Sequence, residues 1–187
     1  MTLRGASAVI AAFVIAGCAT SPVVAPPIAP ATGDAPFAID GRLSARRASD
    51  AVTANFTWRH APPQDDLVLT TPLGQAVAEI SGDQSASRYE LRMADGRREE
   101  ASDWGRLTER ALGAPVPVQG LSAWIGGMPR PGAPYWVEPD ATGRATVLRQ
   151  DGWEIVYGYA DDDPRLPSRL QLTQGDLEIR IVVLRRR

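Results

Sequence analysis

The residues that could carry out enzymatic chemistry are few and scattered along the chain. His60 is the only histidine, and it stands beside Ala61-Pro62-Pro63. We expect it to be a solvated loop histidine and not a general base. The segment Gly120-Leu121-Ser122-Ala123-Trp124 begins like the nucleophile elbow of hydrolases, but it lacks the last glycine and lies in a predicted helix with no strand before it. The sequence therefore predicts no active site, and we expect that the protein is not an enzyme.

Metal and nucleotide sites are equally hard to build from this sequence. Asp161-Asp162-Asp163-Pro164 lacks the alternating ligands and the central glycine of a calcium loop, and one cysteine with one histidine makes no zinc cluster. All 20 basic residues are arginine, so the lysine of a P-loop is missing. The formal net charge of −2 provides no general attraction to nucleic acid. We expect no metal, no cofactor and no nucleic-acid partner.

The single cysteine, Cys18, carries the most specific chemical signal. Arg4 precedes the apolar run 6–16, which is too short to span a bilayer, and Ala16-Gly17 places small residues directly before the cysteine. This pattern is typical of bacterial lipoprotein signals, in which the cysteine thiol receives a diacylglycerol and cleavage occurs just before it. We predict a signal peptide at residues 1–17 and a lipidated N-terminus at Cys18.

The segment that follows Cys18 has the composition of a tether. Five of the 18 residues from Ala19 to Pro36 are proline, which favours polyproline II over a packed element. At about 3.1 Å per residue this segment reaches roughly 50 Å. Ala19 and Thr20 stand where some bacterial lipoproteins carry an aspartate that keeps them at the inner membrane. The sequence thus predicts a lipidated tether at 18–36 and anchoring to the periplasmic face of the outer membrane.

The elements that remain, at residues 37–187, are predicted to form one mainly β domain. Apolar residues alternate with polar ones, for example at Ala54, Phe56 and Trp58, and turn signals recur at short spacing. We expect a curved antiparallel sheet of roughly ten to eleven strands that forms an unclosed, monomeric β-barrel. The stretch around Tyr135-Trp136-Val137 is expected to be irregular.

Two short helices interrupt this pattern of strands. The first is predicted after Ser102 as its N-cap, with Gly113 as its stop. In the second, Leu121, Trp124, Ile125 and Met128 share one face, and Gly126-Gly127 ends it. Two helices with apolar faces in the middle of a β meander must cover one face or mouth of the sheet, so we expect a lid over an apolar interior.

A hairpin over residues 65–80 has an unusual tip, Pro72-Leu73-Gly74. Pro72 fixes a φ that suits a turn and Gly74 can take a positive φ, but nothing in the turn chemistry requires a leucine. Leu73 could fold back onto the sheet, as isolated apolar turn residues usually do. It could instead be an apolar finger for lipid or a partner, since taking a leucine out of water is worth about 1.5–3 kcal/mol.

The five tryptophans offer two interpretations as well. They can simply fill a core, or some of them can line a cavity that accepts acyl chains. Our candidates for the lining of such a cavity are Trp58, Trp124, Ile125 and Trp153.

Short segments spread over nearly the whole chain together resemble the LolB family of Gram-negative outer-membrane lipoproteins. They are Cys18, Gly41-Arg42-Leu43-Ser44, Phe56-Thr57-Trp58, Thr71-Pro72-Leu73-Gly74-Gln75, Gly113-Ala114-Pro115-Val116-Pro117-Val118, Leu121-Ser122-Ala123-Trp124-Ile125-Gly126-Gly127-Met128-Pro129, Asp151-Gly152-Trp153-Glu154-Ile155-Val156-Tyr157 and Leu166-Pro167-Ser168-Arg169-Leu170. Each segment is weak alone, and the specificity lies in their order and spacing. The chain departs from the family at its end, where Val183-Leu184-Arg185 stands in place of a frequent tryptophan.

The resemblance implies an unclosed β-barrel with a helical lid, in agreement with the prediction from the patterns. It also implies a receptor that takes lipoproteins from a soluble, LolA-like periplasmic carrier and inserts them into the inner leaflet of the outer membrane without ATP. Its partners would then be the carrier, lipoprotein acyl chains and outer-membrane lipid, and the family's exposed loop leucine, implicated in insertion, matches Leu73. The alternative is a structural or assembly lipoprotein that binds another envelope protein, while a lipid hydrolase is opposed by the missing nucleophile and base.

Overall fold

The computed structural model describes residues 35–187, so Cys18, the predicted signal peptide and nearly all of the predicted tether lie outside the described residues. The strands are β1 (Phe37–Arg47), β2 (Asp50–Ala61), β3 (Gln64–Thr70), β4 (Ala76–Asp83), β5 (Arg88–Met93), β6 (Arg98–Ala101), β7 (Tyr135–Pro139), β8 (Ala145–Gln150), β9 (Trp153–Tyr159), β10 (Pro167–Gln174) and β11 (Leu177–Arg186). Two helices, α1 (Trp104–Leu112) and α2 (Val118–Trp124), separate β6 from β7.

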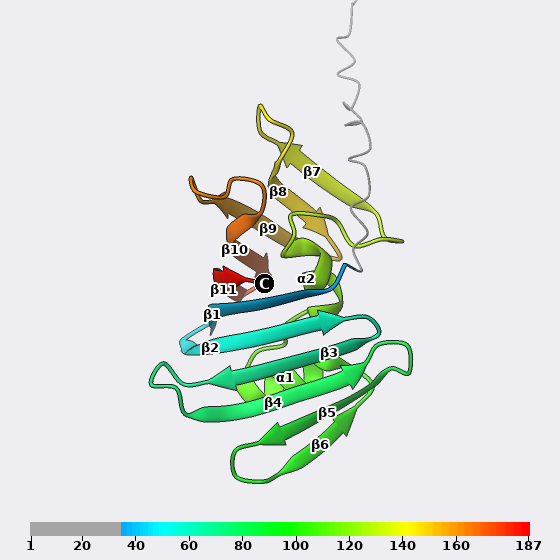
Figure 1. Ribbon diagram of the computed structural model, residues 1–187, viewed down its shortest axis with the longest axis vertical. Helices are drawn as coiled ribbons and strands as arrows, with labels where there is room; N and C mark the ends of the chain where they lie inside the picture. The colour runs from blue at the N-terminus through cyan, green and yellow to red at the C-terminus, as the bar shows by residue number, and fades with distance from the viewer. Residues whose placement is uncertain (1–34) are drawn as a thin grey trace, which may run out of the picture.

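All eleven strands belong to one antiparallel sheet, in the order β6-β5-β4-β3-β2-β1-β11-β10-β9-β8-β7 (Figure 1). Strands that follow one another in sequence pair with each other, except β6 and β7, and the pairing of β1 with β11 joins the two halves of the chain. The two edges are β6 and β7, the strands that flank the helices. The sheet is therefore curved but not closed, which confirms the predicted open, mainly β architecture.

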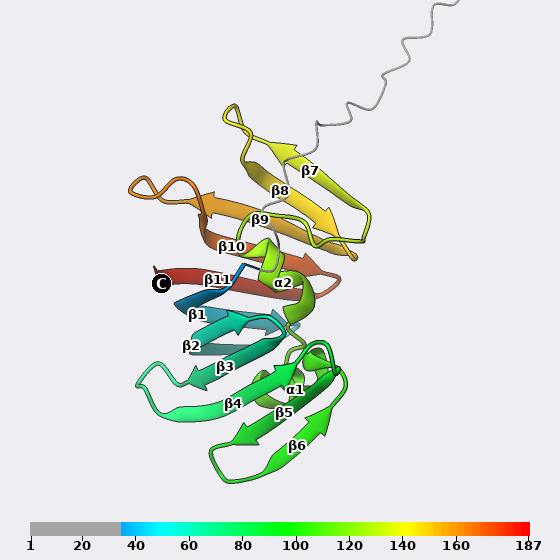
Figure 2. The same ribbon diagram turned by 45° about the vertical axis from the view of Figure 1, so that its right-hand side comes forward.

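Alternation along the strands creates the inner face of the sheet. In β2, the side chains of Ala54, Phe56 and Trp58 are buried, while the residues between them are more exposed. Helix α1 packs against β4, β5 and β6, and α2 lies over the middle of the sheet, as the turned view in Figure 2 shows. The helices thus cover the concave side, as expected for a lid.

The boundaries of the helices differ from the predicted ones by a few residues. Asp103, not Ser102, is the N-cap of α1, because its carboxylate accepts a hydrogen bond from the Gly105 N–H at 3.0 Å. Gly113 ends α1 as predicted, with φ +72° and its N–H bonded to the Glu109 carbonyl. Helix α2 ends at Trp124, so Met128 lies beyond it. None of the helices in the described part of the chain is long and apolar enough to cross a membrane.

The stretch at 135–137 was predicted to be irregular, and this is wrong. Tyr135–Pro139 forms β7, which pairs with β8 and is the last strand at one edge of the sheet. Prolines at 131, 134 and 139 mask its strand character in the sequence. An edge strand tolerates proline because one of its two sides has no neighbour to bond.

Candidate functional site

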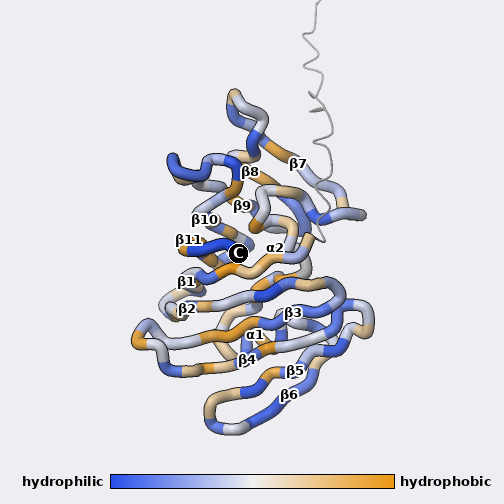
Figure 3. Tube along the Cα trace, in the orientation of Figure 1, coloured by the Kyte–Doolittle hydropathy of each residue, from blue (hydrophilic) through white to orange (hydrophobic). Residues whose placement is uncertain are grey.

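The turn between β3 and β4 presents an apolar side chain to solvent. Gly74 has φ +85° and its N–H donates to the Thr71 carbonyl at 2.9 Å, so residues 71–74 form a tight turn. The side chain of Leu73 is 90% exposed, the largest value among the exposed large hydrophobic residues described. This turn stands out at the left of Figure 1, and Figure 3 colours its tip as hydrophobic. Leu73 therefore does not fold back onto the sheet.

An apolar cavity lies between the concave face of the sheet and the helices. Its lining is entirely apolar and consists of Leu43, Phe56, Trp58, Leu67, Leu69, Leu112, Val116, Val118, Leu121, Ile125 and Ile181. The cavity volume is only about 20 Å³, which is room for about one water molecule. The interior of the structure is thus a packed core, with no room for an acyl chain.

Trp58, one wall of this cavity, is held in place by a buried polar cluster. Its indole N–H donates to Asp65 Oδ1 at 2.8 Å, His60 Nδ1 lies 2.8 Å from the same oxygen, and Gln84 donates to the other one. The expectation that His60 lies in a solvated loop is wrong, because β2 continues to Ala61 and His60 is 1% exposed. Phe37 stacks on its ring with a centroid distance of 4.9 Å.

Trp124 and Trp153 belong to a second, more open groove. It has a volume of about 410 Å³ and is lined by Trp104, Trp124 and Trp153 together with polar residues that include Asp103, Arg130 and Asp151. Of the four candidate cavity residues, Trp58 and Ile125 thus line the inner cavity, whereas Trp124 and Trp153 line the groove. Their ring centroids are 6.5 Å apart.

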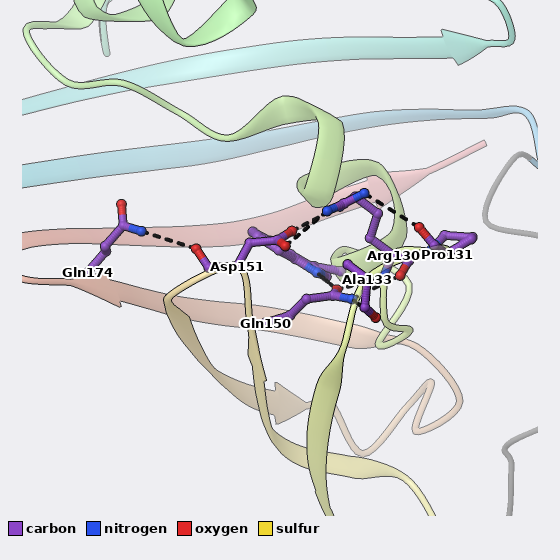
Figure 4. A network of polar contacts seen from close by, with 7 residues as sticks. Arg130, Pro131, Ala133, Gln150, Asp151 and Gln174 are labelled. Carbon is purple, nitrogen blue, oxygen red and sulfur yellow. Dashed lines mark hydrogen bonds and ion pairs between the residues drawn. The ribbon is translucent and has the colours of Figure 1, made fainter.

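A polar network fixes the wall of this groove next to α2. Gln150, 3% exposed, accepts hydrogen bonds from the Trp124 indole at 2.8 Å and from the Arg130 N–H at 2.7 Å. Its own amide donates to the carbonyls of Arg130 and Ala133, and Arg130 forms a bidentate ion pair with Asp151 at 2.9 Å (Figure 4). The network binds α2 and the loop after it to the β8–β9 hairpin.

The connector between the two helices separates the inner cavity from the outer groove. Val116 of the connector and Val118, the first residue of α2, line both of them. The connector is held by Thr108, which is fully buried in α1: its hydroxyl accepts from the Val116 N–H at 2.8 Å and donates to the Gly105 carbonyl at 3.0 Å. This role of Thr108 could not be predicted from the sequence, because a threonine inside a helical pattern gives no sign that its hydroxyl will bond a distant backbone N–H.

An open antiparallel sheet with helices on its concave face defines a class of fold that is known from solved structures. A LolA superfamily protein from Nitrosomonas europaea, solved by crystallography, is similar with a TM-score of 0.50. The similarity covers 82% of this chain and 86% of that chain at 8% sequence identity, so it concerns the fold alone.

Similarity in sequence then defines the family. The family model of outer membrane lipoprotein LolB matches residues 35–185. The outer-membrane lipoprotein LolB of Chromobacterium violaceum is 37% identical over 174 residues, which are 92% of either chain. That of Thiobacillus denitrificans is 38% identical over 175 residues, 91% of this chain and 90% of the relative. The chain belongs to the LolB family.

Proposed function

We propose that the protein is the outer-membrane receptor that accepts lipoproteins from a soluble, LolA-like periplasmic carrier and inserts them into the inner leaflet of the outer membrane. Its partners are the carrier, the acyl chains of the lipoproteins and the lipid of the membrane. It acts as a monomer and not as an enzyme. Membership of a family of outer-membrane lipoproteins supports this function.

The observation that carries the proposal is the exposed turn of residues 71–74. Burying a leucine side chain in an apolar layer is favourable by about 1.5–3 kcal/mol. Leu73 is 90% exposed, so the folded protein in water does not gain this transfer free energy. An exposed leucine on a rigid turn can enter the apolar layer of a membrane without unfolding any other part of the protein. Leu73, supported by Pro72 and Gly74, is the element that we assign to insertion.

Transfer by this protein has to run downhill in affinity. Each CH₂ group of an acyl chain gains about 0.8 kcal/mol when it leaves water, so a chain stays shielded during the whole transfer. A ligand shifts a conformational equilibrium only by the difference in its affinity for the two states. An acyl chain that fits only the open state therefore stabilises that state against the closed interior around Trp58 and Ile125, and the chain leaves when the bilayer binds it more tightly.

The closed interior makes a sharp experimental test possible. We expect a fluorescent fatty-acyl probe to bind saturably at micromolar concentration and to be displaced by a lipoprotein, because α2 and its connector can move aside. The small cavity, about 20 Å³, also suits the alternative, a structural or assembly lipoprotein with a solid core. Absence of saturable binding would favour that alternative.

A second test concerns the anchor. If Cys18 is lipidated, Cys18→Ala will stop acyl labelling and processing by the lipoprotein signal peptidase, since the thiol is the site of diacylglycerol transfer. The measurement is metabolic labelling with a fatty acid, followed by the apparent mass of the chain. Mature protein that still carries the label would refute the assignment of Cys18.

A further inference from the structure

A positive charge lies in an apolar pocket at the end of helix α2. The pocket has a volume of about 210 Å³ and lies between the start of β1, the end of α2 and the loop that leads into β10. Phe37, Ile125, Met128 and Leu166 are among its walls. Arg186, from the end of β11, is the only formally charged residue among those that line it. The pocket therefore combines apolar walls with one cation.

Arg186 ties the end of the helical lid to the sheet. Its Nη2 donates to the Ile125 carbonyl at 2.9 Å and to the Pro167 carbonyl at 2.6 Å. Ile125 is the C-cap of α2, where a cation also interacts favourably with the helix dipole. Burial lowers the pKa of Arg186, because its charged form loses contact with water. The guanidinium thus holds the end of α2 against the sheet, and its burial carries a desolvation cost.

No carboxylate of the described residues compensates for that penalty at ion-pair distance. Arg185 and Arg187, on either side, both reach Asp40, whereas Arg186 forms no ion pair within the described chain. Asp163 acts on Arg186 from a longer distance and is itself paired with Arg165 at 3.1 Å. A guanidinium has five N–H donors, and the two carbonyl bonds use only those of Nη2, so an oxyanion can still be bound.

We propose that this pocket binds the phosphate and the adjoining acyl segment of an anionic membrane phospholipid, and that binding draws Arg186 away from the Ile125 carbonyl and loosens the end of α2. The guanidinium of Arg186 would bind the anionic phosphate, and the apolar walls would contact the hydrocarbon of the acyl segment. Residues 35–37 line the pocket, so the segment that leads back to Cys18 leaves the domain at this point. Its 16 residues from 19 to 34 reach roughly 50 Å when extended, enough for the pocket to touch the bilayer.

The consequence is that the lid responds to the membrane itself. Away from anionic lipid, Arg186 holds α2 closed over the apolar interior. At the bilayer, the phosphate competes with the two carbonyls for the guanidinium, because a phosphate can accept two parallel N–H bonds from an arginine and carries a negative charge that a carbonyl lacks. The interior then opens at the bilayer, which gives cargo a route from the interior into the membrane. This consequence rests on the proposed function, but the phospholipid site does not.

Hydrogen exchange of the full-length protein tests the site without any cargo. The amides to follow are those of Ile125, bonded to the Leu121 carbonyl at 2.9 Å, and Gly126, bonded to that of Ala123 at 3.0 Å. Vesicles that contain phosphatidylglycerol should accelerate their exchange about tenfold relative to phosphatidylcholine vesicles, as expected for one lost hydrogen bond to a charged group. Arg186→Met should exchange fast without vesicles and show no response to phosphatidylglycerol.

Arg185→Met is the matched control, because it removes a neighbouring, mostly exposed arginine that contacts Asp40 instead of the lid. It should keep the full response to phosphatidylglycerol. Arg186→Lys retains the cation and should retain part of the response, which also keeps the test valid if Arg186→Met does not fold. An unchanged response in folded Arg186→Met, a response that falls as far in Arg185→Met as in Arg186→Lys, or an equal response to a soluble short-chain alkyl phosphate would each overturn the proposal.

Discussion

Replacing Leu73 with glutamate is expected to abolish delivery of lipoprotein to the membrane while the protein still folds and still accepts cargo. Leu73 is 90% exposed, so its loss removes almost no packing, and surface substitutions usually change stability by less than about 0.5 kcal/mol. The membrane step loses the transfer free energy of leucine, about 1.5–3 kcal/mol, and a carboxylate also resists entry into an apolar layer. The expected loss in delivery is therefore at least about tenfold.

Three measurements on the same variant decide the role of Leu73: melting temperature, uptake of lipoprotein from the carrier, and delivery to vesicles. Cargo should accumulate on Leu73→Glu, because acceptance precedes the blocked step. Leu73→Met retains an apolar tip and should deliver normally, and Leu184→Glu places the same charge at another exposed position, 66% accessible, and should also deliver. A marked fall in melting temperature, with acceptance and delivery reduced together, would contradict the membrane role.

The regular parts of the sheet could be predicted because apolar and polar residues alternate along these strands in step with burial. In β2, alternation at Ala54, Phe56 and Trp58 requires one buried face, and a period of two leaves no other regular structure. The edge strands gave much weaker signals. The charged β6, Arg98–Ala101, has no apolar face, and β7 lies among prolines. Edge strands are stabilised by a single neighbour, so their own sequence need not look like a strand.

The error at His60 has a different physical origin. Pro62-Pro63 correctly marks the turn between β2 and β3, but a turn of two residues leaves its flanking residues paired, here His60 with Asp65. Whether a polar residue next to a turn is buried depends on partners from across the turn and from Gln84. Local patterns contain no information about such partners.

The free volume of the interior could not be predicted from the sequence. Composition predicts an apolar interior, but the free volume inside it is a small difference between the space enclosed by the sheet and the volume of the side chains that fill it. Trp124 and Trp153 were placed in the cavity because they are large and apolar, yet both line the outer groove. Their positions follow from the path of α2 and from the Gln150 network, which join segments far apart in sequence.

The largest effect on stability is expected from Asp65→Ala. This carboxylate accepts hydrogen bonds from the Trp58 indole, His60 and Gln84, and both Asp65 and His60 are 1% exposed. Its removal leaves three polar groups without their acceptor, and the two that are buried, on Trp58 and His60, are each worth about 1–3 kcal/mol when unpaired. Part of this cost is offset, because the alanine variant no longer has to bury a carboxylate. We therefore expect the free energy of unfolding to fall by about 3–5 kcal/mol.

Urea unfolding followed by circular dichroism measures this loss, and the neighbouring Asp66 provides the control. Asp66 is exposed, so Asp66→Ala should stay within about 0.5 kcal/mol of the natural protein. Asp65→Asn keeps one acceptor oxygen and should fall between the two. Because Asp65 orients Trp58 in the wall of the inner cavity, Asp65→Asn should also weaken binding of the acyl probe, which Asp66→Ala should leave unchanged. If Asp65→Ala lost less than about 1 kcal/mol, the cluster would not be what holds Trp58 in place.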